Sequence, residues 1–121
     1  MSTILLIEDN RASKLLVERI LENDGYTILH AADGETGIAQ AINNEPDLIL
    51  IDMGLPDIDG QTVVTVLKQV APLRNTPMVA ITALPADKAR ITVERYKLDG
   101  CILKPIEVSK FPEQIASYLA T

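Results

Sequence analysis

The sequence predicts a doubly wound α/β fold, in which helices cover both faces of a five-stranded parallel sheet. Short apolar runs alternate five times with longer amphipathic segments along the chain. The runs are apolar throughout, which is typical of strands that are covered on both faces. Alternation of strand and helix favours parallel strands that are joined by right-handed crossovers.

The predicted strands are short, and each is followed by polar or turn-forming residues. In chain order they cover Thr3–Ile7, Tyr26–Ala31, Asp47–Ile51, Met78–Ile81 and Cys101–Leu103.

The predicted helices fill the gaps between the strands and are bounded by helix-breaking or capping residues. Gly25 is suited to close the first helix, and Pro46 and Pro72 follow the second and third. Pro85 favours the start of the fourth helix and Ser109 an N-cap for the fifth. The predicted helices are Arg11–Asp24, Glu35–Asn43, Gln61–Val70, one from about Pro85 to Leu98, and one from after Ser109 to the C-terminus.

Composition predicts a single cytoplasmic domain over residues 1–121, without an output domain. The chain has 121 residues, of which 47% are hydrophobic, enough for one packed core. Apolar runs of four or five residues are too short to span a membrane, and the N-terminus lacks signal-peptide features. A single cysteine excludes an internal disulfide, and a formal net charge of −6 argues against direct nucleic-acid binding.

Polar side chains follow four of the predicted strands, at the point where each strand ends. Glu8 and Asp9 follow the first strand, Asp52 the third, Thr82 the fourth and Lys104 the fifth. The carboxyl ends of parallel strands meet at one edge of the sheet, which is where doubly wound proteins bind ligands. We therefore expect these side chains to form one site.

Three carboxylates in one place predict a magnesium site. They repel one another unless a cation is present, and Mg²⁺ prefers oxygen ligands. We expect Asp9 and Asp52 to bind the ion directly and Glu8 to bind it through water, with the backbone carbonyl of Gly54 as a further ligand.

The same group suits Asp52 to accept a phosphoryl group. A carboxylate beside Mg²⁺ and a lysine can attack a phosphoryl donor, while Lys104 and Thr82 contact the phosphoryl oxygens. Taken singly, Asp9 is more often a turn residue or a helix N-cap, and Lys104 is more often a solvated loop lysine. Thr82 alone fits a helix-start hydroxyl or a strand residue as well as it fits a functional role. Their joint placement at four strand ends favours the functional interpretation.

The motifs resemble those of the receiver domain of bacterial two-component response regulators. The resemblance covers essentially the whole chain and rests on ILLIEDN, DLILIDMGLPDIDG, VAITA and DGCILKPI. It implies a flavodoxin-like (βα)5 fold with strand order 2-1-3-4-5. It also implies that Asp52 is the phospho-acceptor, Glu8 and Asp9 the metal-binding acids, Thr82 a switch hydroxyl and Lys104 the phosphate-contacting lysine, with Pro105 in cis.

One departure from the family pattern, and two residues that flank the expected phosphoryl pocket, bear on signalling. Cys101 stands where the family usually has Tyr or Phe, so the aromatic half of the usual switch is absent or replaced. Its simplest interpretation is a small buried hydrophobic residue rather than a redox sensor. Leu84 and Gly54, at positions that influence phosphate lifetime in the family, offer no group to hold a hydrolytic water, which predicts slow self-dephosphorylation.

Partner contacts are predicted from helical phase. On the first helix, Leu16, Val17, Ile20 and Leu21 share one face and Leu15 points away from it, which makes Leu15 a candidate contact for a histidine kinase or histidine-phosphotransfer protein. On the fourth helix, Ala86, Ala89, Val93 and Tyr96 form the predicted buried face. Ile91 points the opposite way and is a candidate contact for an output partner.

The sequence thus predicts a stand-alone, monomeric signalling switch that assists its own phosphorylation and dephosphorylation and signals through a partner protein or onward phosphotransfer. The pathway stays open between a phosphorelay intermediate, a motility effector and a regulator of a kinase. A receiver-like binding module that acts without phosphorylation is the alternative. A flavin-binding protein is disfavoured because Glu8–Asn10 would repel a phosphate, and an aspartyl phosphatase because Gly54 lacks the second acid.

Overall fold

The computed structural model describes residues 2–119 apart from 54, 56 and 58. Its sheet has five parallel strands in the order β2-β1-β3-β4-β5, as predicted. The strands are β1 Thr3–Ile7, β2 Thr27–Ala31, β3 Leu48–Asp52, β4 Met78–Thr82 and β5 Gly100–Leu103.

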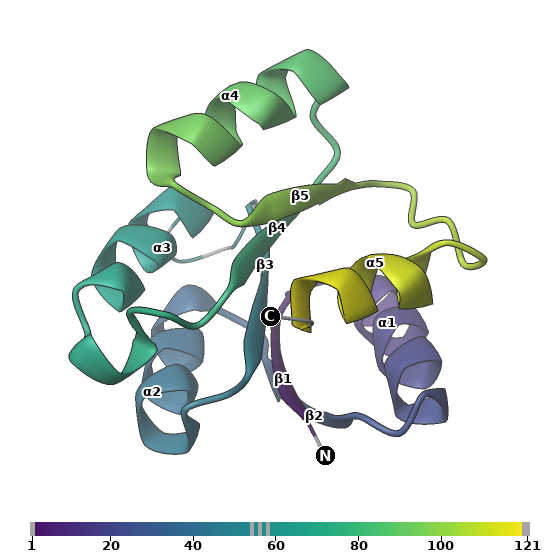
Figure 1. Cartoon of the computed structure of the whole chain (residues 1–121), viewed down its shortest axis with the longest axis horizontal. Coiled ribbons are helices and arrows are strands. Elements are labelled where there is room, and N and C mark those ends of the chain that lie inside the picture. Colours follow the sequence, from purple (N-terminus) through teal and green to yellow (C-terminus); the bar gives the residue numbers. More distant parts are fainter. Residues whose placement is uncertain (1, 54, 56, 58, 120–121) are drawn as a thin grey trace.

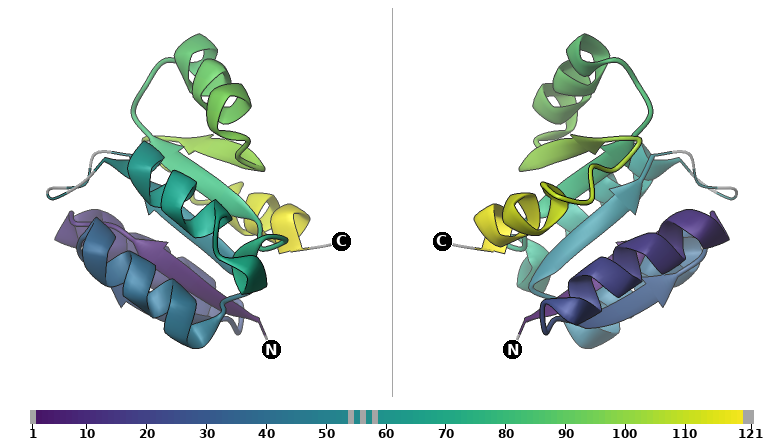
Figure 2. Two further views of the ribbon diagram at one scale, coloured as in Figure 1. Left: turned by 90° about the vertical axis from the view of Figure 1, so that its left-hand side faces the viewer. Right: turned by 90° about the vertical axis from the view of Figure 1, so that its right-hand side faces the viewer.

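Helices cover both faces of the sheet, with α1 and α5 on one face and α2, α3 and α4 on the other (Figure 1 and Figure 2). They are α1 Arg11–Asn23, α2 Gly34–Asn44, α3 Gly60–Lys68, α4 Ala86–Tyr96 and α5 Phe111–Leu119, with a short 3₁₀ helix at Ala71–Leu73 after α3. This is the predicted doubly wound architecture.

Each face of the sheet has its own apolar core. Alternate residues of the central strands face opposite sides, so that Ile4 and Leu6 join the core under α1 and α5, whereas Leu5 and Ile7 join the core under α2 and α3. All four side chains are fully buried. The central strands are thereby held from both sides, which fixes the position of the residues that follow them.

Side-chain caps begin three of the helices. Asn10, Asp33 and Asp59 each accept a hydrogen bond from the backbone N–H three residues later, at 2.9, 2.7 and 2.8 Å. These bonds satisfy amide groups that have no partner inside the helix. Asn10 directly follows Glu8 and Asp9, and Asp59 ends the loop that follows Asp52. The caps therefore also fix where the loops around the predicted site end.

Element boundaries differ from the predicted ones by one or two residues, and two capping predictions have distinct outcomes. Gly25 has a φ of 89°, as predicted for a residue that ends α1 in the left-handed region. Ser109 does not begin α5, because residues 107–110 form a turn and the helix starts at Phe111. Asp52 is the last residue of β3 rather than the residue after it, since it pairs with Ile81 of β4.

Two predicted buried faces are only partly correct. In α1, Val17 and Leu21 are buried, but Leu16 is 39% exposed, because it lies at the margin of the face rather than on it. In α4, Ala89 is buried and Ala86 is exposed, because the first turn of this helix borders an open hollow beside β5 and does not pack closely on the sheet. No helix in the described part of the chain has the length and apolar character that crossing a membrane requires.

Candidate functional site

The carboxyl ends of β1, β3, β4 and β5 bring together the acids, the hydroxyl and the amine that were predicted to meet. Glu8 and Asp9 follow β1, Asp52 ends β3, Thr82 ends β4 and Lys104 follows β5. Carboxylate oxygens of Glu8, Asp9 and Asp52 lie within 4.8 Å of one another. The three acids therefore form a single acidic cluster.

Glu8 is the buried member of this cluster. Its residue is 1% exposed, and its Oε2 accepts a hydrogen bond from the backbone N–H of Asn10 at 3.3 Å. Burial raises the pKa of Glu8 to about 7, and hydrogen bonding and charge repulsion from Asp52 act in the same direction. Without a cation, the cluster thus holds back the ionisation of one of its own acids.

Lys104 supplies the positive charge next to these acids. Its Nζ lies 3.2 Å from Oε1 of Glu8 and 3.8 Å from Oδ1 of Asp52. The peptide bond between Lys104 and Pro105 is cis, as the resemblance implies. The backbone N–H of Lys104 donates to the carbonyl of Thr82 at 2.7 Å, which ties the lysine to the end of β4.

A cavity of about 460 Å³ opens beside Asp52. It is lined by Asp52, Met53, Gln61, Thr82, Ala83, Leu84 and Lys104. The hydroxyl of Thr82 accepts a hydrogen bond from the backbone N–H of Leu84 at 3.1 Å and keeps its own hydrogen to donate. Asp52 is accessible from this cavity, because its side chain is 13% exposed.

Strand β2 holds the backbone of Glu8 through His30, a residue that the sequence analysis did not select. Nε2 of His30 lies 2.8 Å from the carbonyl oxygen of Glu8, and the N–H of Glu8 donates to the carbonyl of Ala31 at 3.0 Å. Because a carbonyl can only accept, the Nε2 atom carries the hydrogen in this contact. Both backbone groups of Glu8 are therefore fixed by the edge strand.

Asp57, in the loop between β3 and α3, is a second residue that the sequence analysis did not select. Its carboxylate accepts hydrogen bonds from the backbone N–H groups of Gly34 and Glu35, at 2.8 and 3.0 Å. These groups begin α2, where exposed N–H groups and the helix dipole favour a negative charge. The loop that follows β3 is thereby attached to α2 through Asp57.

The acidic cluster fits Mg²⁺. The carboxylate oxygens of Glu8, Asp9 and Asp52 are hard ligands at a spacing that one small cation can bridge, and Asp9 is exposed to solvent and to waters that the ion would retain. Burial is the main cause of the raised pKa of Glu8, and the neighbouring Asp52 adds to it, so a cation at the cluster would favour the ionised form of Glu8. Gly54, whose carbonyl was predicted as a ligand, lies outside the described residues.

Comparison with known proteins identifies the family. The family model of the response regulator receiver domain matches residues 4–116. The chain belongs to the response regulator receiver domain family. Receiver domains are signalling switches of two-component systems that take phosphoryl groups from histidine kinases.

Relatives match this receiver over nearly their whole length. The polar-differentiation response regulator DivK of Brucella ovis is 35% identical over 120 residues, which are 97% of this chain and 95% of DivK. The receiver domain of a sensor histidine kinase from Pseudomonas aeruginosa PAO1, with a magnesium ion coordinated in its active-site cleft, is 25% identical at a TM-score of 0.90, over 99% of this chain and 98% of that one.

The chemotaxis response regulator CheY4 of Vibrio cholerae shares the fold of this receiver. It matches with a TM-score of 0.92 at 22% identity, over 98% of this chain and 99% of that one. The predicted family and strand order are thus confirmed.

Three other residues that the sequence analysis selected, Cys101, Leu15 and Ile91, do not take part in the acidic cluster. Cys101 is half-buried on β5 and packs against the core under α2 and α3, and burial raises the pKa of its thiol. Leu15 on α1 and Ile91 on α4 are 46% and 55% exposed, as expected for side chains that point away from the sheet.

Proposed function

We propose that this receiver accepts a phosphoryl group on Asp52 from a histidine kinase or a histidine-phosphotransfer protein. The observation that carries the proposal is the position of Asp52, which faces a cavity of about 460 Å³ with Lys104 at 3.8 Å and two further acids beside it. A carboxylate so placed has both access to a donor and positive charge next to it. Cytoplasmic location, as expected from the sequence, is part of the proposal.

In the proposed reaction, a carboxylate oxygen of Asp52 attacks the phosphorus of a phosphohistidine. The phosphorus–nitrogen bond breaks, its electron pair stays on the imidazole, and an acyl phosphate forms on Asp52. Lys104 exchanges part of its contact with Glu8 for a phosphoryl oxygen, and the Thr82 hydroxyl donates to another. Thr82 and the backbone of Lys104 are joined by a hydrogen bond, so a shift of Thr82 reaches β5 and the region of Cys101.

Mg²⁺ belongs to the proposed reaction as a cofactor held by Asp9 and Asp52, with Glu8 acting through water and the carbonyl of Gly54 completing the set. When bound, the ion supplies positive charge that offsets the charge of the phosphoryl oxygens. The experimental magnesium complex of the Pseudomonas relative supports this assignment.

The decisive experiment is incubation with Mg²⁺ and acetyl phosphate, followed by intact-mass measurement. The wild-type protein is expected to gain one phosphoryl group, and Asp52→Asn is expected to gain none. Asp47→Asn is the matched control, because Asp47 caps the start of β1 at the opposite end of the sheet. Labelling of Asp52→Asn at the wild-type level would refute the proposal, and a wild type that no donor labels would favour a binding module without phosphorylation.

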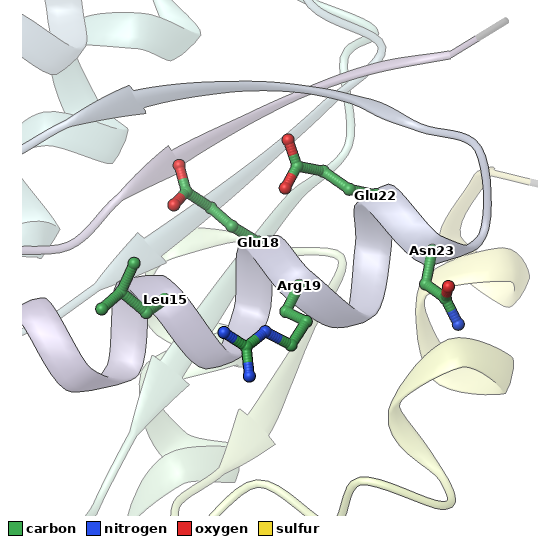
Figure 3. Close-up of a pocket in the computed structure, with 5 residues that line it drawn as sticks. All are labelled: Leu15, Glu18, Arg19, Glu22 and Asn23. Atoms are coloured by element: carbon green, nitrogen blue, oxygen red, sulfur yellow. The ribbon is translucent and has the colours of Figure 1, made fainter.

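We further propose that the donor contacts α1 through Leu15. Leu15 lines a hollow of about 430 Å³ on the outer side of α1, together with Glu18, Arg19, Glu22 and Asn23 (Figure 3). An exposed leucine among charged side chains gives a partner both apolar area and orienting charges. Leu15→Asp is expected to slow transfer from the protein donor and to spare labelling by acetyl phosphate. Equal loss of both reactions would contradict this contact.

Signalling to a downstream partner, or onward phosphotransfer, is proposed to use the opposite side of the molecule. Ile91 on α4 is the candidate contact, since it is 55% exposed and its helix follows β4, which ends at Thr82. The proposed active unit is a monomer. Ile91→Asp is expected to leave labelling by acetyl phosphate intact, and size-exclusion chromatography of the labelled protein tests the monomeric state.

A further inference from the structure

Gln61 lies in the wall of the cavity that faces Asp52. It is on the first turn of α3, its side chain is half-buried, and it lines the same cavity as Thr82 and Lys104. Neither the acidic cluster nor the lysine contact uses it. The role of this carboxamide is therefore not explained by phosphoryl acceptance alone.

Close backbone packing holds Gln61 beside the phospho-acceptor. A Cβ atom on Gly60 would lie 2.8 Å from the Cα of Met53 and 3.1 Å from the carbonyl oxygen of Asp52. Only glycine therefore allows α3 to begin so close to the end of β3. Asp59 caps the same turn through the N–H of Thr62 at 2.8 Å, which fixes the direction in which residue 61 leaves the helix.

The side chain of Gln61 is uncommitted. Within the described part of the chain, its carboxamide makes no hydrogen bond, although its backbone carbonyl accepts one from Thr65. By contrast, Thr82 accepts from the N–H of Leu84, and Lys104 is paired with Glu8. A carboxamide offers one acceptor oxygen and two donor hydrogens, so Gln61 can bind a water molecule at this wall.

The other side chains around the open part of the cavity cannot do this. Met53, Ala83 and Leu84 have no group that holds a water strongly, and Leu84 is 40% exposed, which leaves the cavity open to solvent. Among the described residues of the wall, Thr82 and Gln61 have neutral polar side chains. The proposed reaction assigns the hydroxyl of Thr82 to a phosphoryl oxygen, which leaves Gln61 to hold a water. Gln61 therefore offers a group that can hold a hydrolytic water, which the sequence analysis did not find at Leu84 and Gly54.

We propose that Gln61 holds the water that hydrolyses the phosphoryl group on Asp52 and thereby sets the lifetime of the phosphorylated state. The inference rests on the proposed phosphorylation of Asp52. The water oxygen forms a bond to phosphorus, the bond from phosphorus to the carboxylate oxygen breaks, and its electron pair returns to Asp52. The water proton passes to a phosphoryl oxygen, and orthophosphate leaves. Oε1 of Gln61 accepts a hydrogen bond from the water and does not change its own protonation.

The test compares the decay of the phosphorylated form in wild type, Gln61→Leu and Gln61→Asn. Each protein is labelled with acetyl phosphate and Mg²⁺, separated from the donor by desalting, and followed by intact mass. The loss of one positioned hydrogen bond is expected to slow decay about tenfold in Gln61→Leu. In Gln61→Asn the carboxamide is shorter and reaches less far into the cavity. Its phosphorylated form is expected to decay more slowly than that of the wild type and no more slowly than that of Gln61→Leu. This variant provides the test if Gln61→Leu does not fold.

The ratio of decay rate to labelling rate separates a role in hydrolysis from a merely structural one. Attack by Asp52 needs no water, so this ratio is expected to fall about tenfold in Gln61→Leu. Gln69→Leu, at the opposite and exposed end of α3, serves as the matched control with an unchanged ratio.

Decay of Gln61→Leu at the wild-type rate or faster, or an equal fall in both rates, would overturn the inference. A wild type that is not labelled at Asp52 would instead overturn the proposed function, so the two failures are distinguishable.

Discussion

The ammonium group of Lys104 lies 3.2 Å from Oε1 of Glu8, a side chain that is 1% exposed. A lysine that follows the last strand thus compensates an acid that follows the first. This contact explains how a nearly buried carboxylate is tolerated next to Asp52, because an unpaired charge there would be costly. In the proposed reaction, it also keeps the lysine next to the phosphoryl group that forms on Asp52.

Replacement of Lys104 by alanine is expected to slow phosphorylation strongly. The variant loses the charge beside Asp52, and the loss of one such donor typically costs about 10²-fold in rate. Acetyl phosphate labelling, followed by intact mass, measures the effect. Lys110→Ala is the control, since Lys110 is 68% exposed and pairs with Glu107 at the surface. Labelling of Lys104→Ala at the rate of this control would exclude a role for Lys104.

The raised pKa of Glu8 predicts that stability without a divalent cation falls as pH rises from about 5 to 7. The pKa is about 7 in the folded state against 4.5 for a free glutamate side chain, so the folded state binds more protons across this window. Full ionisation costs up to about 3 kcal/mol of unfolding free energy. Urea unfolding in EDTA should show this loss.

Glu8→Gln is the matched variant for this pH dependence, because it cannot ionise. Its unfolding free energy is expected to change less between pH 5 and 7 than that of the wild type. Added Mg²⁺ is expected to reduce the loss in the wild type by binding the ionised cluster. Identical pH profiles of wild type and Glu8→Gln in EDTA would contradict the shift.

Loss of the His30 side chain is expected to weaken Mg²⁺ binding. Nε2 of His30 holds the carbonyl of Glu8, and partners that orient metal ligands typically contribute about tenfold in affinity. Calorimetric titration of His30→Ala with Mg²⁺ checks this value. His30→Gln, which keeps an N–H donor, is expected to recover part of the affinity. Equal Mg²⁺ affinities of His30→Ala and wild type would show that this contact does not orient the acids.

Removal of the Asp57 carboxylate is expected to loosen the start of α2. Asp57→Ala leaves the N–H groups of Gly34 and Glu35 without their partner, which should lower the unfolding free energy by about 1 kcal/mol. Hydrogen exchange of these two amides should accelerate, whereas the amide of Thr36 stays protected by Asp33. Unchanged exchange at Gly34 and Glu35 would be inconsistent with the contact.

The thiol of Cys101 is expected to react slowly. Burial raises its pKa, so little thiolate is present at neutral pH. Alkylation by iodoacetamide at pH 7.5 should be slower than that of free cysteine and should accelerate on unfolding in urea. Rapid alkylation of the native protein would indicate a reactive thiol and revive a redox role.

The strand ends and the acidic cluster could be predicted because they depend on patterns within short segments. An apolar run that stops at Asp52 marks the end of a buried strand, and the parallel arrangement then brings it to Glu8 and Lys104. His30 could not be found in this way, because its partner is a backbone carbonyl on another strand, and every residue has one.

Gln61 and Leu16 illustrate two other limits of sequence reasoning. Gln61 faces the site because Gly60 lets α3 approach Asp52 closely, and this distance is a tertiary property. The available signal in the sequence was a glycine at the start of a capped helix. Leu16 was wrongly grouped with the buried face, because helical phase gives a direction but not the width of the sheet beneath it.

The 96 positions that separate Glu8 from Lys104 have a consequence for protein synthesis. Contacts between such distant residues form late, and here the lysine emerges from the ribosome long after the acids do. A nascent chain without β5 carries Asp52 but lacks the amine of Lys104 beside it. Under the proposed function, incomplete copies are therefore expected to be poor phosphoryl acceptors.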